Sequence, residues 1–113
     1  LVSMHCIEFE NCRDSCEEVV LWFLREYLPK GLFFLTVEEK DLSEEGVDGW
    51  CMRETQNEFL IQVDKNILIP SFYTRVLLHE LFHMYQYYND LDTDEDETLE
   101  QEHILLNKYY RNH

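Results

Sequence analysis

Residues 76–86 read VLLHELFHMYQ, the stretch that organises the predicted fold. It holds two histidines, His79 and His83, with the acid Glu80 directly after the first. The surrounding apolar residues predict a largely buried helix, on which positions four apart lie one turn apart on the same face. Two imidazoles placed in this way can share a metal ion, and zinc accepts histidine nitrogen at ~2.0–2.1 Å. Glu80 is then a candidate general base, since it reaches the activated water without being a ligand.

The motif needs only three fixed residues, so it arises by chance in many proteins. Its apolar context favours a metal site, because polar groups inside an apolar helix are costly to bury without a partner or a metal. The alternative is a helix whose two histidines only make hydrogen bonds in the core. Imidazole and carboxylate ligands also accept divalent ions other than zinc.

The composition predicts one small acidic domain over residues 1–113. A chain of 113 residues with 45% hydrophobic residues can build one modest core. Its formal net charge of −15 argues against direct nucleic-acid binding, because an acidic surface repels phosphate. Such a charge would favour basic partners or basic substrate segments, but the simpler interpretation is that it serves solubility alone. We expect no membrane association, since no apolar run reaches ~18 residues and no signal-peptide pattern is present.

The four cysteines include no Cys-x-x-Cys pair. Cys6, Cys12 and Cys16 cluster near the N-terminus, but their spacing matches no zinc pattern, and Cys51 stands apart. We interpret all four as reduced, partly buried thiols, which predicts a cytoplasmic protein.

The other elements follow from turn residues and hydrophobic periodicity. They are a strand over 4–10, a helix over 15–28, a strand over 32–38, a hairpin of strands over 50–54 and 58–63, the motif helix over 71–88 and a final helix over 97–111. This order predicts an α+β domain, with one helix packed on a small twisted mixed sheet and the motif helix beneath. The acidic stretch 89–96 lacks the glycine and closing glutamate of a calcium loop, so we expect a solvated connector there.

A catalytic zinc site normally has three protein ligands, so the two histidines need a third. The final helix offers Glu100, Glu102 and His103 if it folds back against the motif helix. On a helix, Glu100 and Glu102 lie about 200° apart and cannot both face the metal. Glu100 shares its face with His103, whereas Glu102 lies on a more apolar surface that can serve for packing alone. Periodicity leaves all three candidates open.

The motif followed by an acidic helix resembles the gluzincin metallopeptidases. Residues 77–87 are similar to the motif helix of the shortest members, the minigluzincins and the small metallopeptidases of phages and mobile elements. Residues 99–103, LEQEH, resemble the glutamate helix of that group, in which the ligand lies three residues before an alanine. The resemblance implies a zincin-like fold and Glu100 as the third ligand, with His103 in the alanine position and Ile104 where relatives often hold aspartate.

The motif and the resemblance together predict a zinc-dependent metallopeptidase that acts on a peptide or protein substrate. In this hypothesis His79, His83 and Glu100 hold Zn²⁺, and Glu80 is the general base. We expect the strand over 58–63 to bind an extended peptide by edge pairing.

Two alternatives belong to other functional classes. One is a binding module that keeps the zincin scaffold with little or no turnover. The other is a structural metal site closed by four ligands, His79, His83, Glu100 and His103, which leaves no open position for water.

Overall fold

The computed structural model describes residues 4–113, which form strands and helices in the predicted order. The elements are β1 (Met4–Glu10), α1 (Asp14–Tyr27), β2 (Leu32–Lys40), β3 (Gly49–Thr55), β4 (Glu58–Asp64), α2 (Pro70–Tyr88) and α3 (Glu95–Asn112). The strands form one sheet in the order β1-β2-β4-β3, in which β1, β2 and β4 are parallel and β3 is antiparallel to β4. The predicted α+β class with a small mixed sheet is therefore confirmed.

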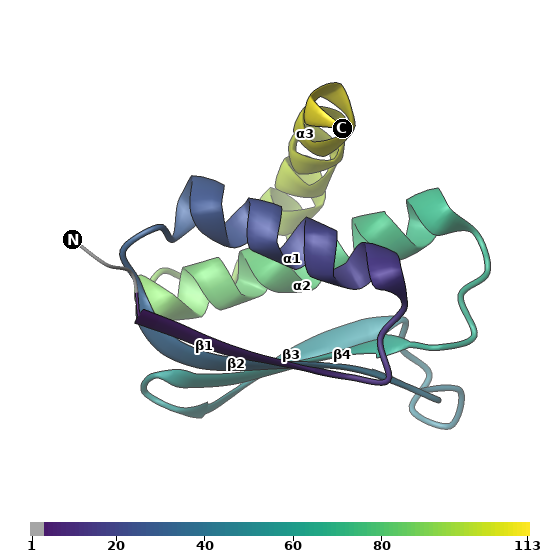
Figure 1. The fold of residues 1–113 in the computed structure, drawn as a ribbon, viewed down its shortest axis with the longest axis horizontal. Helices are drawn as coiled ribbons and strands as arrows, with labels where there is room; N and C mark the ends of the chain where they lie inside the picture. Colours follow the sequence, from purple (N-terminus) through teal and green to yellow (C-terminus); the bar gives the residue numbers. More distant parts are fainter. Residues whose placement is uncertain (1–3) are drawn as a thin grey trace.

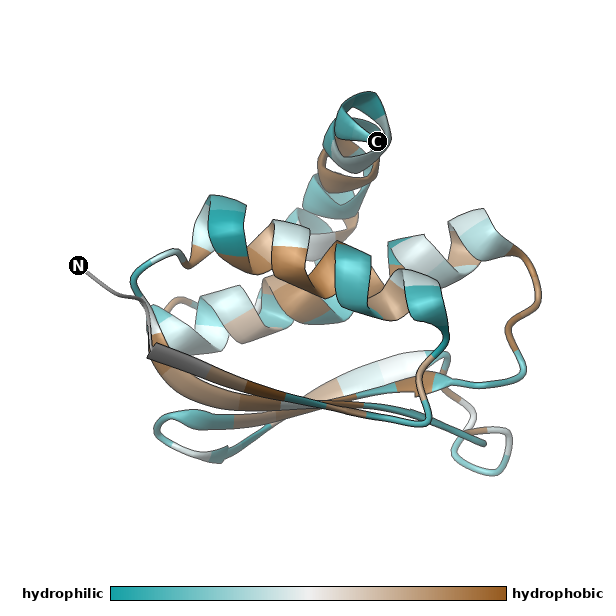
Figure 2. Ribbon diagram, viewed as in Figure 1, coloured by the Kyte–Doolittle hydropathy of each residue, from teal (hydrophilic) through white to brown (hydrophobic). Residues whose placement is uncertain are grey.

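Both α1 and α2 lie on the same face of the sheet (Figure 1). Side chains alternate along a strand, so one face of β2 and β4 carries the buried apolar residues, which are Phe33, Leu35, Val37, Phe59, Ile61 and Val63. Apolar residues of the two helices belong to the same core cluster as this face. In Figure 2 both helices alternate between hydrophobic and hydrophilic stretches along the ribbon, as amphipathic helices do. The expected position of the motif helix beneath the sheet was wrong: among residues 4–113, no helix covers the opposite face (Figure 1).

The motif helix α2 is the central element of the fold. It contacts α1, α3, β3 and β4. Its buried residues lie all around the helix, as expected for a helix that is apolar on every side; they include Tyr73, Leu77, Leu78, Leu81 and Met84. A helix of this kind must be covered by other elements on several sides, and α3 packs against the side of α2 that is turned away from the sheet.

The strand at the edge of the sheet near α2 is β3. The predicted edge pairing by residues 58–63 is wrong, because β4 already pairs with β2 on one side and with β3 on the other. The strand β3 begins at Gly49, where an added Cβ would lie 2.9 Å from Cγ1 of Val76 and 3.3 Å from Cγ of Glu80. Glycine therefore permits β3 to approach the motif helix this closely.

The final helix begins two residues before the predicted start. The carboxylate of Asp94 accepts hydrogen bonds from the backbone N–H groups of Asp96 and Glu97, which makes Asp94 the N-cap. Acidic side chains in the first turn also interact favourably with the helix dipole. The predicted connector therefore ends at Asp94, and Glu95 lies in the first turn of α3.

The cysteines range from exposed to fully buried, and all are free thiols. Cys6 is exposed, Cys12 and Cys51 are half-buried, and Cys16 is buried in the core. Within residues 4–113, no helix has the length and apolar character needed to cross a membrane.

Candidate metal centre

The two motif histidines lie one turn apart on α2, on the side that faces α3. Their ring centroids are 4.8 Å apart. Nδ1 of His79 lies 2.9 Å from Oε2 of Glu102, and Nδ1 of His83 lies 2.9 Å from Oε1 of Gln86. A carboxylate only accepts hydrogen bonds, so Nδ1 of His79 donates to Glu102, and Nδ1 of His83 donates in the same way when the amide oxygen of Gln86 faces it. A neutral imidazole that is protonated at Nδ1 has a lone pair on the opposite nitrogen, Nε2, and this lone pair can bind a metal.

Both Nε2 atoms face the carboxylate of Glu95. Oε1 of Glu95 lies 2.8 Å from Nε2 of His83, and Oε2 lies 3.4 Å from Nε2 of His79. One ligand atom from each of the three residues falls within 4.8 Å of the other two. Within residues 4–113, His79, His83 and Glu95 therefore lie close enough together to hold a metal ion. Two imidazoles and a carboxylate are a donor set that fits zinc and leaves a fourth position open.

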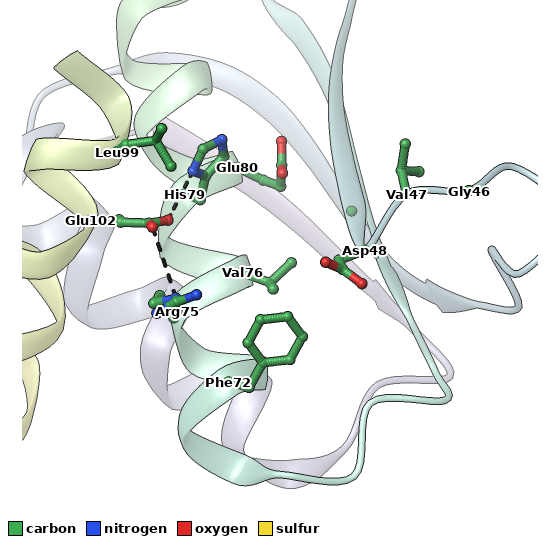
Figure 3. A pocket seen from close by; sticks show the side chains of 11 residues that line it. Gly46, Val47, Asp48, Phe72, Arg75, Val76, His79, Glu80, Leu99 and Glu102 are labelled. Atoms are coloured by element: carbon green, nitrogen blue, oxygen red, sulfur yellow. Dashed lines mark hydrogen bonds and ion pairs between the residues drawn. The ribbon is translucent and has the colours of Figure 1, made fainter. Parts of the chain in front are cut away.

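The three predicted candidates for the third ligand lie in different places. The structure does not bring Glu100 and His103 to the histidines: among residues 4–113, neither belongs to the group of side chains that could hold a metal with them. Glu102 is buried and contacts His79, but through Nδ1 rather than Nε2. Its carboxylate also lies 3.8 Å from the guanidinium of Arg75 (Figure 3). Glu102 therefore orients one histidine and its charge is partly balanced.

Packing decides which side of α3 faces the site. Leu105 and Tyr109 are buried, and Tyr109 packs edge-on against Trp22 of α1 at 5.4 Å. Residues at the same rotational position, spaced three and four apart, turn toward α2 with them; they are Glu95, Thr98 and Glu102. The apolar stripe of the helix thus sets the rotation that exposes Glu100.

Sequence reasoning missed Glu95 because it assigned this residue to the connector. Two signals could have found it. Asp94 followed by three acidic residues is an N-cap signature, which moves the helix start to Glu95. Glu95 also lies seven positions before Glu102, so the two carboxylates share one face of a helix.

Gln86 and Thr98 complete the surroundings of His83. The side-chain oxygen of Gln86 lies 3.4 Å from the hydroxyl of Thr98, whose single proton is donated to the backbone carbonyl of Asp94 at 2.7 Å. This contact joins the motif helix to the first turn of α3. Thr98 therefore contacts both the side-chain amide of Gln86, which faces His83, and the backbone of Asp94, which caps the helix before Glu95.

Glu80 lies beside the histidines, against the start of β3. Only 6% of the residue is exposed. Burial raises the pKa of Glu80 to about 7, with nearby His79 lowering it and the charges of Glu95 and Glu102 raising it. A carboxylate with a pKa near neutrality can both accept and return a proton at physiological pH. Figure 3 shows it at the end of a cavity between α2 and the loop that leads into β3.

Comparison of the chain with protein-family models, with curated proteins and with solved structures finds no match. The resemblance to the gluzincins thus has no support beyond the residues that carry it, and neither the family nor a zincin fold is shown.

Proposed function

We propose that this chain is a zinc-dependent peptidase with a zincin-like arrangement of its motif helix and closing helix. One observation carries the proposal: Nε2 of His79 and Nε2 of His83 converge on one carboxylate, while each Nδ1 is held by an acceptor. His79, His83 and Glu95 would hold the metal. A purely structural pair of histidines does not require both Nε2 atoms to face the same acid.

The side chains around this group have separate tasks in the proposed reaction. When bound, zinc would supply positive charge that polarises a carbonyl and lowers the pKa of water toward ~7. Glu80 takes a proton from the attacking water and returns it to the leaving amine. Glu102 and Gln86 hold the imidazoles in the tautomer that leaves Nε2 free.

The free edge of β3 offers a place for the substrate backbone. This strand pairs with β4 on one side only, and its first residue, Gly49, lies against Glu80. An extended peptide that adds to this edge gains main-chain hydrogen bonds and passes close to the general base.

The test compares the wild type with the Glu80→Gln variant. We expect both proteins to bind about one zinc per chain, because Glu80 is not among the three ligand residues. The wild type should cleave members of a diverse peptide library, and the variant should lose on the order of 100-fold or more of that rate. Zinc content is measured by elemental analysis and cleavage by mass spectrometry.

Glu100→Gln is the matched control, since it makes the same chemical change at an exposed position on α3. It should keep both zinc and cleavage. If the wild type binds zinc but cleaves nothing in the library, the chain is a binding scaffold or a structural metal site instead. If it binds no zinc at neutral pH, the proposal fails altogether.

A further inference from the structure

A cavity of about 320 Å³ opens beside His79 and Glu80. One wall comes from α2, where Phe72 and Val76 present apolar surface, and the facing wall is the loop over residues 46–49 (Figure 3). The volume lies at the lower end of the ~300–1,000 Å³ typical of ligand sites. It is suited to one long side chain rather than to a large ligand.

The charged groups of the cavity are mostly acidic. Asp48, Glu80 and Glu102 contribute carboxylates, and Arg75 is the cation among the lining residues. Arg75 lies 3.8 Å from Glu102 and 5.5 Å from the ring of Phe72. In Figure 3 it lies toward α3, on the opposite side of the cavity from Asp48.

Asp48 is an exposed acidic residue of the cavity lining whose carboxylate is accessible to a ligand. Its side chain points from the loop toward Phe72 and Val76 (Figure 3). Its backbone carbonyl accepts a hydrogen bond from Asp64 at 2.8 Å, which holds the loop to the end of β4. Among residues 4–113, no hydrogen bond or ion pair engages the Asp48 carboxylate itself.

We infer that this cavity is a specificity pocket for a lysine or arginine side chain of the substrate, next to the bond that is cleaved. This inference rests on the proposed peptidase function. The aliphatic stem would lie along Phe72 and Val76, as long basic side chains do on apolar surface, and the cationic end would meet Asp48. The net charge of −15 would also attract basic peptides to the molecule.

The experiment measures peptide binding to the zinc-loaded Glu80→Gln variant, which keeps the site without turnover. The probes are blocked decapeptides of Gly, Ser and Ala that differ only in one central residue: lysine, arginine, norleucine or glutamate. We expect the lysine and arginine peptides to bind about 10-fold more tightly than the norleucine peptide. Adding Asp48→Asn should reduce this preference to about 2-fold.

Glu44→Gln is the matched control, because it removes the same charge from the same loop at an exposed position outside the cavity. It should leave the preference intact. Equal binding of the norleucine and lysine peptides would overturn the inference. A preference for basic peptides that survives Asp48→Asn would also overturn it, because the preference would then come from the overall charge of the protein.

Cleavage by the wild type separates this inference from the proposed function. A wild type that cleaves the norleucine peptide as fast as the lysine peptide refutes the pocket and supports the peptidase. A wild type that cleaves neither these peptides nor any member of the diverse library, while Asp48-dependent binding persists, refutes the peptidase and supports the pocket. Absence of both binding and cleavage overturns both.

Discussion

At the two motif histidines, the partner of each Nδ1 determines what the opposite nitrogen can do. Glu102 is an acid that a search for ligands considers first, yet its carboxylate contacts the Nδ1 of His79. In that position it would orient a proposed ligand without being one. Glu95 contacts both Nε2 atoms although it is an exposed residue in the first turn of α3.

The three acids of α3 should therefore rank in their effect on zinc affinity. Glu95→Ala removes a proposed ligand and should weaken zinc binding by at least about 100-fold. Glu102→Gln removes the charge that orients His79 and should cost about 10–100-fold. Glu100→Ala, which removes an equal charge from the exposed side, should change the affinity by less than about 2-fold. Competition with a chromophoric chelator measures all three.

The opposite order would restore the ligand that the gluzincin resemblance implied. If Glu100→Ala weakens zinc binding more than Glu95→Ala, then α3 rotates when the metal binds. A circular dichroism spectrum of each variant checks that the helix content is unchanged.

At the scale of elements, the site depends on where α3 begins. The cap at Asp94 places Glu95 in the first turn, and the hydroxyl of Thr98 links that turn to Gln86 on α2. Further along, Leu105 and Tyr109 fix the rotation of the helix by packing. The group of side chains that could hold a metal is thus assembled by a cap and by an apolar stripe on one helix.

Asp94→Ala should disturb the metal site although Asp94 is not a ligand. Loss of the cap costs about 1 kcal/mol of stability and lets the first turn unwind, which moves Glu95 away from the histidines. We expect zinc affinity to fall by roughly 10-fold, since the cost of re-forming the turn is taken from the binding free energy. Calorimetric titration with zinc measures this change.

Asp92→Ala is the control for that experiment. It removes the same charge from the exposed connector, two residues before the cap. Its zinc affinity should stay within about 2-fold of the wild type, because screened surface charges contribute little. A similar loss in both variants would mean that acidic charge, rather than the cap, supports the metal.

At the scale of the whole molecule, the proposed active site lies against the core and so affects the stability of the fold. Glu80 is buried between α2 and the start of β3, where burial raises its pKa to about 7, although in an unfolded chain the pKa would be ~4.3. The folded state then holds a proton that the unfolded state loses. The free energy of unfolding of the metal-free protein therefore falls as the pH rises between these two values.

Glu80→Gln should remove this cost. In the presence of a chelator, we expect the variant to exceed the wild type in free energy of unfolding by roughly 3 kcal/mol at pH 8. The difference should shrink below about 0.5 kcal/mol at pH 4, where Glu80 is protonated in both states. Urea denaturation at several pH values measures it. A difference that does not depend on pH would mean that packing, rather than charge burial, separates the two proteins.

Local patterns in the sequence were sufficient for the order of the elements, the α+β class and the histidine pair. The hairpin of β3 and β4 follows from a short polar turn between alternating segments, and the motif helix from its apolar run after Pro70. These features depend on neighbours in the chain, so periodicity and turn chemistry predict them.

The sequence by itself determined that two imidazoles lie one turn apart on a buried helix with an acid beside them, because helical geometry connects only residues close in the chain. Tertiary structure alone decided which acids meet them. The rotation of α3 is set by the burial of Leu105 and Tyr109 against other helices, and the edge position of β3 by its pairing with β4. Both are contacts between distant parts of the chain. Periodicity indicates which face of a helix is apolar, but it does not show which element covers that face.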